Sequence, residues 1–493
     1  MISAHLPVLQ VVVPLVSAPL IVLLRRAGAG WLVACAASAF SLFSAVSILL
    51  HVQEFGVVSY AIGNWPPPWG IEYRIDAANA FVLVLLGVVA TVVALYARTS
   101  VAAEVPAEQR YLFYAMYCLC LAGLAGITVT GDAFNIFVFM EISSLSSYVL
   151  IALGRNRRAL LAAYQYLILG TIGATFIVIG IGLLYLVTGT LNLRDIAARL
   201  PGVEQVRPML AGLAFLTVGI SLKAALFPLH MWLPRAYEYA PSAVAALLAA
   251  TATKVSLYVL LRFYFSVFGA AFVFGVLPMG DLLLGLSLAA MFVGSAAAVY
   301  QSDFKRMLAY SSVAQIGYIT LGISFASKTG LTGGIVHLFN HGVTKGALFM
   351  LAGAVFYRLQ DTSLERMAGL ARAMPFTCAG IVLGGLSLIG VPGTAGFVTK
   401  WYLVLAAIEA GAWWIAFMPV ASSLLAVAYV WRFVEVAYFR APAESVAGLR
   451  EAPAGLLVPA ALLLAAVVYF GIDPALTVDA AARAAESLLA GAR

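Results

Sequence analysis

Long apolar segments separated by short polar loops recur from one end of this 493-residue chain to the other. Each is long enough to cross roughly 30 Å of hydrocarbon as a helix. Backbone groups inside a bilayer must bond to one another, so each segment is predicted to be helical. The pattern predicts about fourteen spans, near 6–24, 31–51, 77–97, 110–130, 133–153, 162–188, 208–230, 242–267, 270–300, 307–325, 331–357, 376–403, 411–438 and 453–471. The predicted fold class is an all-α, polytopic membrane protein.

The loops between the spans predict the orientation of the chain. Basic residues gather in loops that follow odd-numbered spans, such as those of Arg25 and Lys305. The positive-inside rule places these loops in the cytoplasm and both termini outside. The loop around Trp65 and Trp69 then lies outside, at the interface that tryptophan favours. Because no basic residue precedes Arg25, the first span is predicted to be retained rather than cleaved as a signal peptide.

Composition supports a membrane protein and argues against other classes. Hydrophobic residues make up 63% of the chain and charged residues only 10%, against about 25% charged in soluble domains. The net charge of +7 comes from basic residues scattered over short loops, without the basic stripe that binds nucleic acid. The four cysteines lie in apolar segments and form no disulfide, iron–sulfur or haem motif (Cys35, Cys118, Cys120 and Cys378). Neither a nucleic-acid partner nor a cofactor is predicted.

Two predicted spans contain helix breakers at the depth of the bilayer. The seventh contains Pro228, and the twelfth contains Pro392 and Gly393. Each also carries a lysine, Lys223 in the seventh span and Lys400 in the twelfth. One such helix alone would fit a kinked packing helix, whereas a corresponding pair is typical of inverted-repeat transporters.

Ionisable residues inside the spans are the strongest functional signal. A charge at the bilayer centre is costly, so each of these residues is a candidate functional residue. A buried lysine can lose its proton near neutral pH, whereas arginine stays charged. A proton relay needs a group that can lose and regain its proton, so lysine suits a relay and arginine does not. A neighbouring carboxylate would hold the proton on the lysine until the pair opens. The candidates for a proton pathway are Glu141, Lys223, His230, Lys254, His337, His341, Lys345 and Lys400.

Three of these candidates share one helix face, because His337, His341 and Lys345 are four residues apart. The histidine spacing would also suit two zinc ligands, but no third ligand follows. A hydrated proton-conducting face is therefore favoured over a metal site, and no metal is predicted. Ordinary polar packing remains an alternative for this face, as do snorkelling for the lysines and a static ion pair for Glu141.

The candidates lie in motifs that cover nearly the whole chain. These are Phe-Met-Glu141-Ile-Ser-Ser, Lys223-Ala-Ala-Leu-Phe-Pro-Leu-His, Ala-Thr-Ala-Thr-Lys254, Lys305-Arg-Met-Leu-Ala-Tyr-Ser-Ser, His337-Leu-Phe-Asn-His341-Gly-Val-Thr-Lys345, and Gly390-Val-Pro-Gly through Lys400. At these residues the sequence resembles the proton-conducting antiporter-like family. That family comprises large membrane-arm subunits of respiratory complex I, related hydrogenase subunits and large subunits of Mrp cation/proton antiporters.

The resemblance implies two inverted five-helix repeats. The expected division is 1–109 for three N-terminal helices, 110–267 and 268–440 for the repeats, and 441–493 for the last helix and tail. It also implies roles for the candidates. Glu141 and Lys223 would form the ion pair of the first half-channel. Lys254 and the histidine-bearing face would link the halves, and Lys400 would donate protons to the far side.

Within the family, the length and the lysine at 400 are similar to the D-type subunit of Mrp antiporters. This implies a proton-translocating subunit of a multisubunit Na⁺/H⁺ antiporter, not an enzyme, in a bacterial inner membrane. Its expected partners are other membrane subunits, H⁺, Na⁺ and the lipid bilayer. One type of complex I subunit also carries lysine there. The alternative is therefore a proton-pumping subunit of a complex I-like NADH:quinone oxidoreductase or a membrane-bound hydrogenase.

Overall fold

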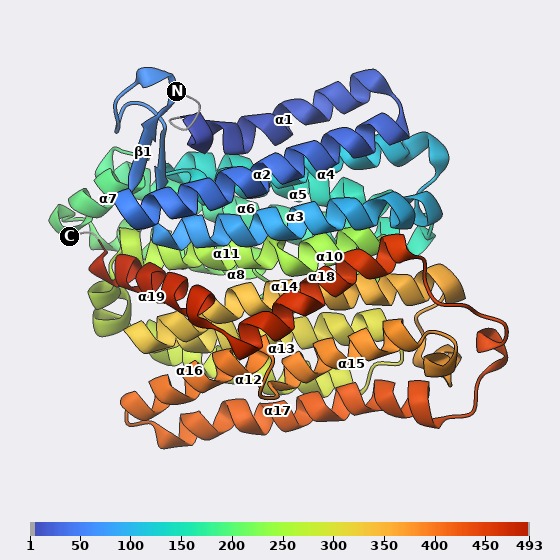
Figure 1. Ribbon diagram of the computed structural model, residues 1–493. Coiled ribbons are helices and arrows are strands. Elements are labelled where there is room, and N and C mark those ends of the chain that lie inside the picture. Colours follow the sequence, from blue (N-terminus) through green and yellow to red (C-terminus); the bar gives the residue numbers. More distant parts are fainter. Residues whose placement is uncertain (1–4, 492–493) are drawn as a thin grey trace.

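The computed structural model describes residues 5–491, which form helices lying side by side (Figure 1). The first are α1 (Leu6–Leu24), α2 (Ala27–Phe55), α3 (Ala77–Glu104), α4 (Arg110–Val129), α5 (Ala133–Ala152), α6 (Arg157–Thr188) and α7 (Leu193–Arg199). The middle of the chain forms α8 (Val206–Lys223), α9 (Leu233–Tyr239), α10 (Ser242–Ala250), α11 (Ala252–Leu261), the π-helical turns Arg262–Val267 and Ala271–Val276, and α12 (Met279–Val299). The remaining helices are α13 (Phe304–Ser324), α14 (Lys328–Leu359), α15 (Pro375–Ile389), α16 (Ala395–Glu409), α17 (Trp413–Val434), α18 (Ala454–Ile472) and α19 (Ala475–Ala490).

The prediction of an all-α, polytopic membrane protein is confirmed. Among the described residues, eleven helices are long and apolar enough to cross a membrane, or twelve if one bent pair counts as a span. Helices also occupy the predicted spans 307–325, 331–357 and 376–403, as α13, α14 and the pair α15–α16. The first two carry more polar residues but are almost wholly buried in protein. The count of fourteen spans stays a prediction.

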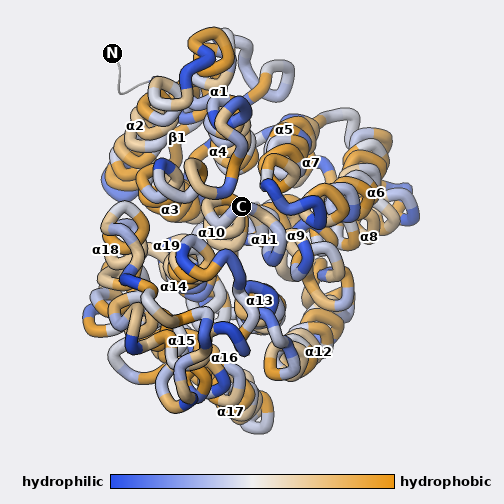
Figure 2. The backbone as a smooth tube through the Cα atoms, turned by 90° about the vertical axis from the view of Figure 1, so that its right-hand side faces the viewer, coloured by the Kyte–Doolittle hydropathy of each residue, from blue (hydrophilic) through white to orange (hydrophobic). Residues whose placement is uncertain are grey.

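The most buried helices lie inside the bundle. Figure 2, which looks along the helices, shows α10 and α14 surrounded by other helices, with α2, α6, α12 and α17 towards the outside. All of α10 is buried, and α14 is buried from Gly330 to Val355. The outer helices expose large apolar side chains, such as Leu161 of α6 and Leu424 of α17. Their outer faces therefore suit lipid or neighbouring subunits.

Helices break at three points inside the bundle. α8 ends at Lys223 and Pro228 lies in the gap before α9, while Pro392 and Gly393 lie between α15 and α16. The structure adds a third break at Thr251, between α10 and α11, where φ is −125° and ψ is −54°. The sequence did not reveal this break because neither glycine nor proline marks it. The inverted repeats and the four-part division stay predictions.

Two peripheral elements extend the predicted picture. The loop between α2 and α3 contains an antiparallel hairpin of β1 (Val58–Ala61) and β2 (Glu72–Ile75), which is the one sheet in the described chain. α19 packs against α3 and α14 through a buried stripe that includes Ala481 and Ala485. Small side chains allow this close approach. The segment Ala475–Ala490 is thus a helix docked on the bundle.

Candidate functional site

The ion pair between Glu141 and Lys223 joins α5 to the broken end of α8. Lys223 Nζ lies 3.0 Å from Glu141 Oε1 and donates a second hydrogen bond, of 2.8 Å, to Ser144 Oγ. The lysine side chain is 3% exposed and the glutamate side chain 24% exposed. The carboxylate therefore stands at the edge of the subunit, while the ammonium lies inside it.

The break after Lys223 leaves backbone groups that other side chains satisfy. The indole Nε1 of Trp232 donates to the carbonyl of Leu222, at 2.9 Å. His230, also in the break, is buried. Its ring stacks on Phe227 and meets the edge of Tyr310 in α13. The structure thus places His230 between the broken helix and α13.

Lys254 lies one turn beyond the break at Thr251. Its side chain is buried, and its Nζ donates to the carbonyl of Ala249 at the end of α10. A longer contact, of 3.4 Å, joins Nζ to Thr253 Oγ1. The break is therefore what brings a backbone acceptor to this ammonium.

The face of α14 that carries His337, His341 and Lys345 points into the bundle. The two imidazole rings are nearly parallel, with centroids 5.5 Å apart, and their nitrogens have no hydrogen-bond partner among the described residues. Lys345 Nζ donates to the carbonyl of Leu308 and to Ser311 Oγ, both in α13. Buried imidazole nitrogens need partners, and ordered water is the usual one where protein supplies none.

Lys400 lies at the second predicted break. Its Nζ donates to the last carbonyls of α15, at 3.1 Å to Leu388 and 2.5 Å to Ile389. It also donates to Ser423 Oγ of α17 at 2.5 Å, and it lies 5.0 Å from the centre of the Tyr318 ring. A helix C-terminus carries partial negative charge, which stabilises an ammonium there.

The predicted lysines differ in how their charge is balanced. Within residues 5–491, Lys223 has a salt-bridge partner, whereas Lys254, Lys345 and Lys400 bond to carbonyl and hydroxyl oxygens. Neutral acceptors compensate a buried charge less than a carboxylate does. These three ammonium groups are therefore compensated by neutral dipoles. No cluster of three metal-ligating side chains occurs in the described chain.

A cleft at the C-terminal end of α3 contains functional candidates that the sequence did not reveal. Lys305 Nζ donates to Ser242 Oγ at 2.9 Å, and Ser242 Oγ donates to Glu104 Oε2 at 3.0 Å. The sequence predicts a loop position for Lys305, but this residue is 3% exposed. Glu104 lies outside the predicted span because α3 runs seven residues beyond the predicted end of that span, from 97 to 104.

The cleft has a volume of about 270 Å³. Besides Glu104 and Lys305, acidic residues including Glu238 and Asp303 line it. Burial raises the pKa of both Glu238 and Asp303 above the usual range of a carboxyl group. Carboxyl groups of raised pKa bind protons at a higher pH than free carboxyl groups do.

Known proteins resemble this chain over most of its length. The family model described as "NADH:quinone oxidoreductase/Mrp antiporter, TM" matches residues 130–426. The chain is 41% identical to the N-type subunit of the NADH-quinone oxidoreductase of Desulforudis audaxviator, over 95% of this chain and 96% of that protein. It is 34% identical to the D-type subunit of the Na⁺/H⁺ antiporter of Alkalihalophilus pseudofirmus, over 73% of this chain and 72% of that protein.

Solved structures show the same fold. A chain of the Mrp complex from Dietzia sp. superimposes with a TM-score of 0.90 at 26% identity, covering 99% of this chain and 98% of that chain. The chain belongs to the NADH:quinone oxidoreductase/Mrp antiporter family of membrane proteins.

Proposed function

We propose that this chain is the proton-translocating subunit of a multisubunit, Mrp-type Na⁺/H⁺ antiporter in a bacterial cytoplasmic membrane, with both termini outside. The observation that carries the proposal is that all four mid-span lysines are buried and each donates to oxygen acceptors inside the bundle (Lys223, Lys254, Lys345 and Lys400). Buried ammonium groups are costly in a membrane interior, and proton relays are a principal reason to retain them.

The proposed pathway starts at the Glu141–Lys223 pair. When the pair is closed, the carboxylate stabilises a proton on Lys223, and when it opens, burial favours release of that proton. Lys254 and Lys345 would carry the proton onward beside the two histidines, whose free ring nitrogens suit bridging water. Lys400, which donates to carbonyl and hydroxyl oxygens, would release it to the far side.

The cleft beside Lys305 suits a water-accessible opening on the cytoplasmic side. Lys305 lies in the first turn of the same helix, α13, whose Leu308 and Ser311 accept hydrogen bonds from Lys345. Protons leaving the interior would thus have a short route along α13 to the carboxyl groups of the cleft.

Partner subunits are expected on the exposed face of α5. Val138, Leu145 and Val149 are exposed there and lie at helical spacing with Glu141. A partly exposed carboxylate within an apolar strip fits contact with another membrane subunit better than contact with lipid tails. A neighbouring subunit on this face would be able to open or close the Glu141–Lys223 pair.

A second candidate function uses the same pathway. The relative at 41% identity is named as a subunit of an NADH-quinone oxidoreductase. This favours a membrane subunit in which redox chemistry elsewhere in a complex drives the proton movement. In either case the chain itself is a transporter subunit, and catalysis would belong to other subunits.

Everted vesicles from an antiporter-deficient bacterium that expresses the whole native gene cluster would test the proposal. Respiration establishes a pH gradient, and Na⁺ or K⁺ is then added. We expect the added cation to collapse the gradient in the wild type but not in Lys223→Ala. An assembled complex that shows no collapse would refute antiport and favour the redox-driven alternative.

A further inference from the structure

An apolar groove runs along the outer surface of the bundle between α15 and α18. Its volume is about 370 Å³, and its floor includes Leu351 of α14, the buried helix that lies inward of both (Figure 2). Ala379 of α15 and Ala461 and Ala465 of α18 line the walls, and these small side chains leave the space open. Every residue that lines the groove is apolar. The groove therefore suits a hydrocarbon ligand.

The groove has the depth of one leaflet of a bilayer. Its lining on α18 runs from Leu457 to Val468, eleven residues further on, which is about 16 Å of helix. One leaflet is about half of the roughly 30 Å hydrocarbon core. Beyond the groove α18 meets the break before α16, where an added Cβ on Gly471 would collide with the backbone of Thr394. A helix of a neighbouring subunit would cross both leaflets, whereas a lipid acyl chain occupies one.

The open end of the groove lies where α15 and α18 begin. The backbone N–H of Phe376 donates a 2.8 Å hydrogen bond to Glu451 Oε2, and the hydroxyl of Thr377 donates to the other carboxylate oxygen. Arg358, at the end of α14, donates to the backbone carbonyl of Glu451. The positive-inside rule predicts that this end faces the cytoplasm. The carboxylate of Glu451 is thus engaged by the first turn of α15.

Two exposed arginines at this end have no counter-ion in the protein. Arg450 directly precedes Glu451, and Arg372 lies four residues before Phe376. The side chain of neither arginine forms an ion pair or a hydrogen bond within residues 5–491. Both positive charges are therefore free to bind an anion from outside the chain.

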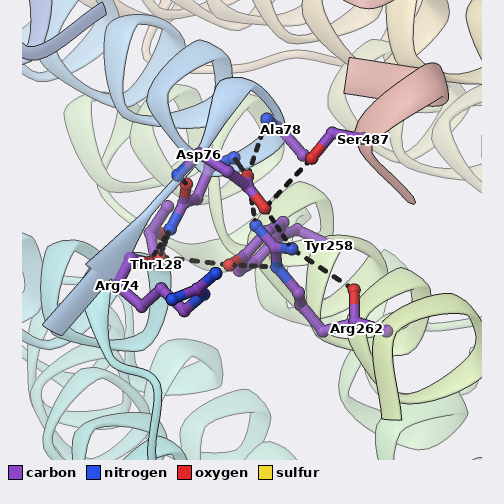
Figure 3. A network of polar contacts seen from close by, with 9 residues as sticks. Arg74, Asp76, Ala78, Thr128, Tyr258, Arg262 and Ser487 are labelled. Atoms are coloured by element: carbon purple, nitrogen blue, oxygen red, sulfur yellow. Dashed lines mark hydrogen bonds and ion pairs between the residues drawn. The ribbon is translucent and has the colours of Figure 1, made fainter. Parts of the chain in front are cut away.

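A buried arginine elsewhere in the bundle shows the contrast. Arg262, just after α11, forms two parallel hydrogen bonds with Asp76, of 2.5 and 2.6 Å, and donates to the hydroxyl of Tyr258 at 2.8 Å (Figure 3). That guanidinium has its anion inside the protein. For Arg372 and Arg450, the anionic headgroups of the cytoplasmic leaflet are the adjacent source of negative charge.

We propose that the groove between α15 and α18 binds an anionic phospholipid of the cytoplasmic leaflet. One acyl chain lies in the groove, and the phosphate lies beside Arg372 and Arg450. Basic residues at the cytoplasmic end of a crevice between membrane helices are the arrangement that such headgroups favour. The bound chain packs against α15, whose last carbonyls accept hydrogen bonds from Lys400. This site goes beyond proton transport and would serve an antiporter and a redox-driven complex alike.

Photocrosslinking in the whole complex tests the site. The complex is reconstituted in phosphatidylcholine vesicles that contain phosphatidylglycerol with a photoreactive group in its acyl chain, and labelled peptides are identified by mass spectrometry. We expect labelling of α15 and α18. Ala461→Phe fills the groove and should abolish this labelling. Leu462→Phe is the matched control, because Leu462 lies on the same helix, does not line the groove and is 52% exposed.

The charge at the open end is tested separately. Arg372→Gln with Arg450→Gln should lower labelling by the phosphatidylglycerol probe about tenfold, since each basic residue near a membrane surface adds attraction for anionic lipid. Labelling by a phosphatidylcholine probe should stay the same in this variant. Arg440→Gln is the control, because Arg440 lies at the same end but is paired with Glu435.

Three results would overturn the proposal. Equal labelling of α15 and α18 by the two probes would show that the groove does not select anionic lipid. Labelling of the exposed face of α17 without labelling of α15 and α18 would show that another subunit covers the groove. Labelling that persists in Ala461→Phe, or in Ala465→Phe should the first variant fail to assemble, would place the lipid elsewhere.

The readout is lipid binding, so it is independent of ion transport. A wild-type complex without Na⁺/H⁺ exchange would refute the antiporter, and labelling of α15 and α18 in that complex would still support the lipid site.

Discussion

Lys223 Nζ lies 3.0 Å from Glu141 Oε1, yet the lysine is enclosed in the bundle and the glutamate reaches its surface. The contact joins the last residue of α8 to the middle of α5. A change at the surface around Glu141 would therefore alter the proton affinity of an interior group. Because Glu141 is partly exposed and Lys223 is enclosed, a neighbouring subunit that contacts Glu141 would be able to control the ion pair.

Lys223→Ala is expected to abolish cation-driven collapse of the pH gradient while the complex still assembles. Lys223→Arg should fail as well, because arginine keeps the charge but cannot release the proton. We expect both to lower transport by at least about tenfold, the scale set by losing a proton-transfer group. Lys328→Ala is the matched control, since Lys328 is 58% exposed. Full activity in Lys223→Ala would remove Lys223 from the pathway.

Glu141→Gln should impair transport severely, because glutamine keeps the size of the side chain and loses the charge that holds a proton on Lys223. Ser144→Ala removes only a neutral acceptor, 2.8 Å from the same ammonium. Its effect should be smaller by about tenfold, because a carboxylate stabilises a neighbouring ammonium by its charge as well as by hydrogen bonding. Equal initial rates of Na⁺-driven alkalinisation in both variants would reduce Glu141 to a structural role.

Gly390→Ala should disturb the second helix break and the lysine that it holds. Gly390 has a φ of +87°, and an added Cβ would lie 2.6 Å from Cδ of Lys400. The left-handed conformation alone costs a non-glycine residue about 1–2 kcal/mol. We expect a lower melting temperature of the purified complex and loss of transport.

The control for this variant is Gly182→Ala in α6, where an added Cβ meets no atom within 4 Å. It should leave both the melting temperature and the transport rate unchanged. An unaltered transport rate in Gly390→Ala would show that the position of Lys400 at the break is not needed.

His341→Phe should lower transport by about tenfold, because it removes two ring nitrogens at which bridging water would bind and a general acid–base group typically contributes at least that much. His51→Phe is the control, since His51 is exposed on α2. Both rates are measured as Na⁺-driven collapse of the pH gradient, with and without a zinc chelator. Inhibition of the wild type by the chelator would contradict a metal-free hydrated face.

Much of the fold could be predicted from local chemistry. Apolar length gives the membrane helices, and Pro228 together with Pro392 and Gly393 gives two breaks, because these residues act on their own turn of backbone. Lysines at mid-span are conspicuous in the sequence because a bilayer interior penalises them wherever they occur. The resemblance at the motifs around Glu141 and Lys223 also implied an ion pair between these two residues, and the structure contains that contact.

Tertiary structure alone decided the rest. The break at Thr251 has no breaker residue, and Lys305 is buried only because α3 and α10 bring Glu104 and Ser242 to it. Asp76 and Arg262 are 186 residues apart in the sequence, and neither local sequence indicates that the two residues form an ion pair. A sequence shows which groups are costly to bury, but their partners depend on how distant helices pack.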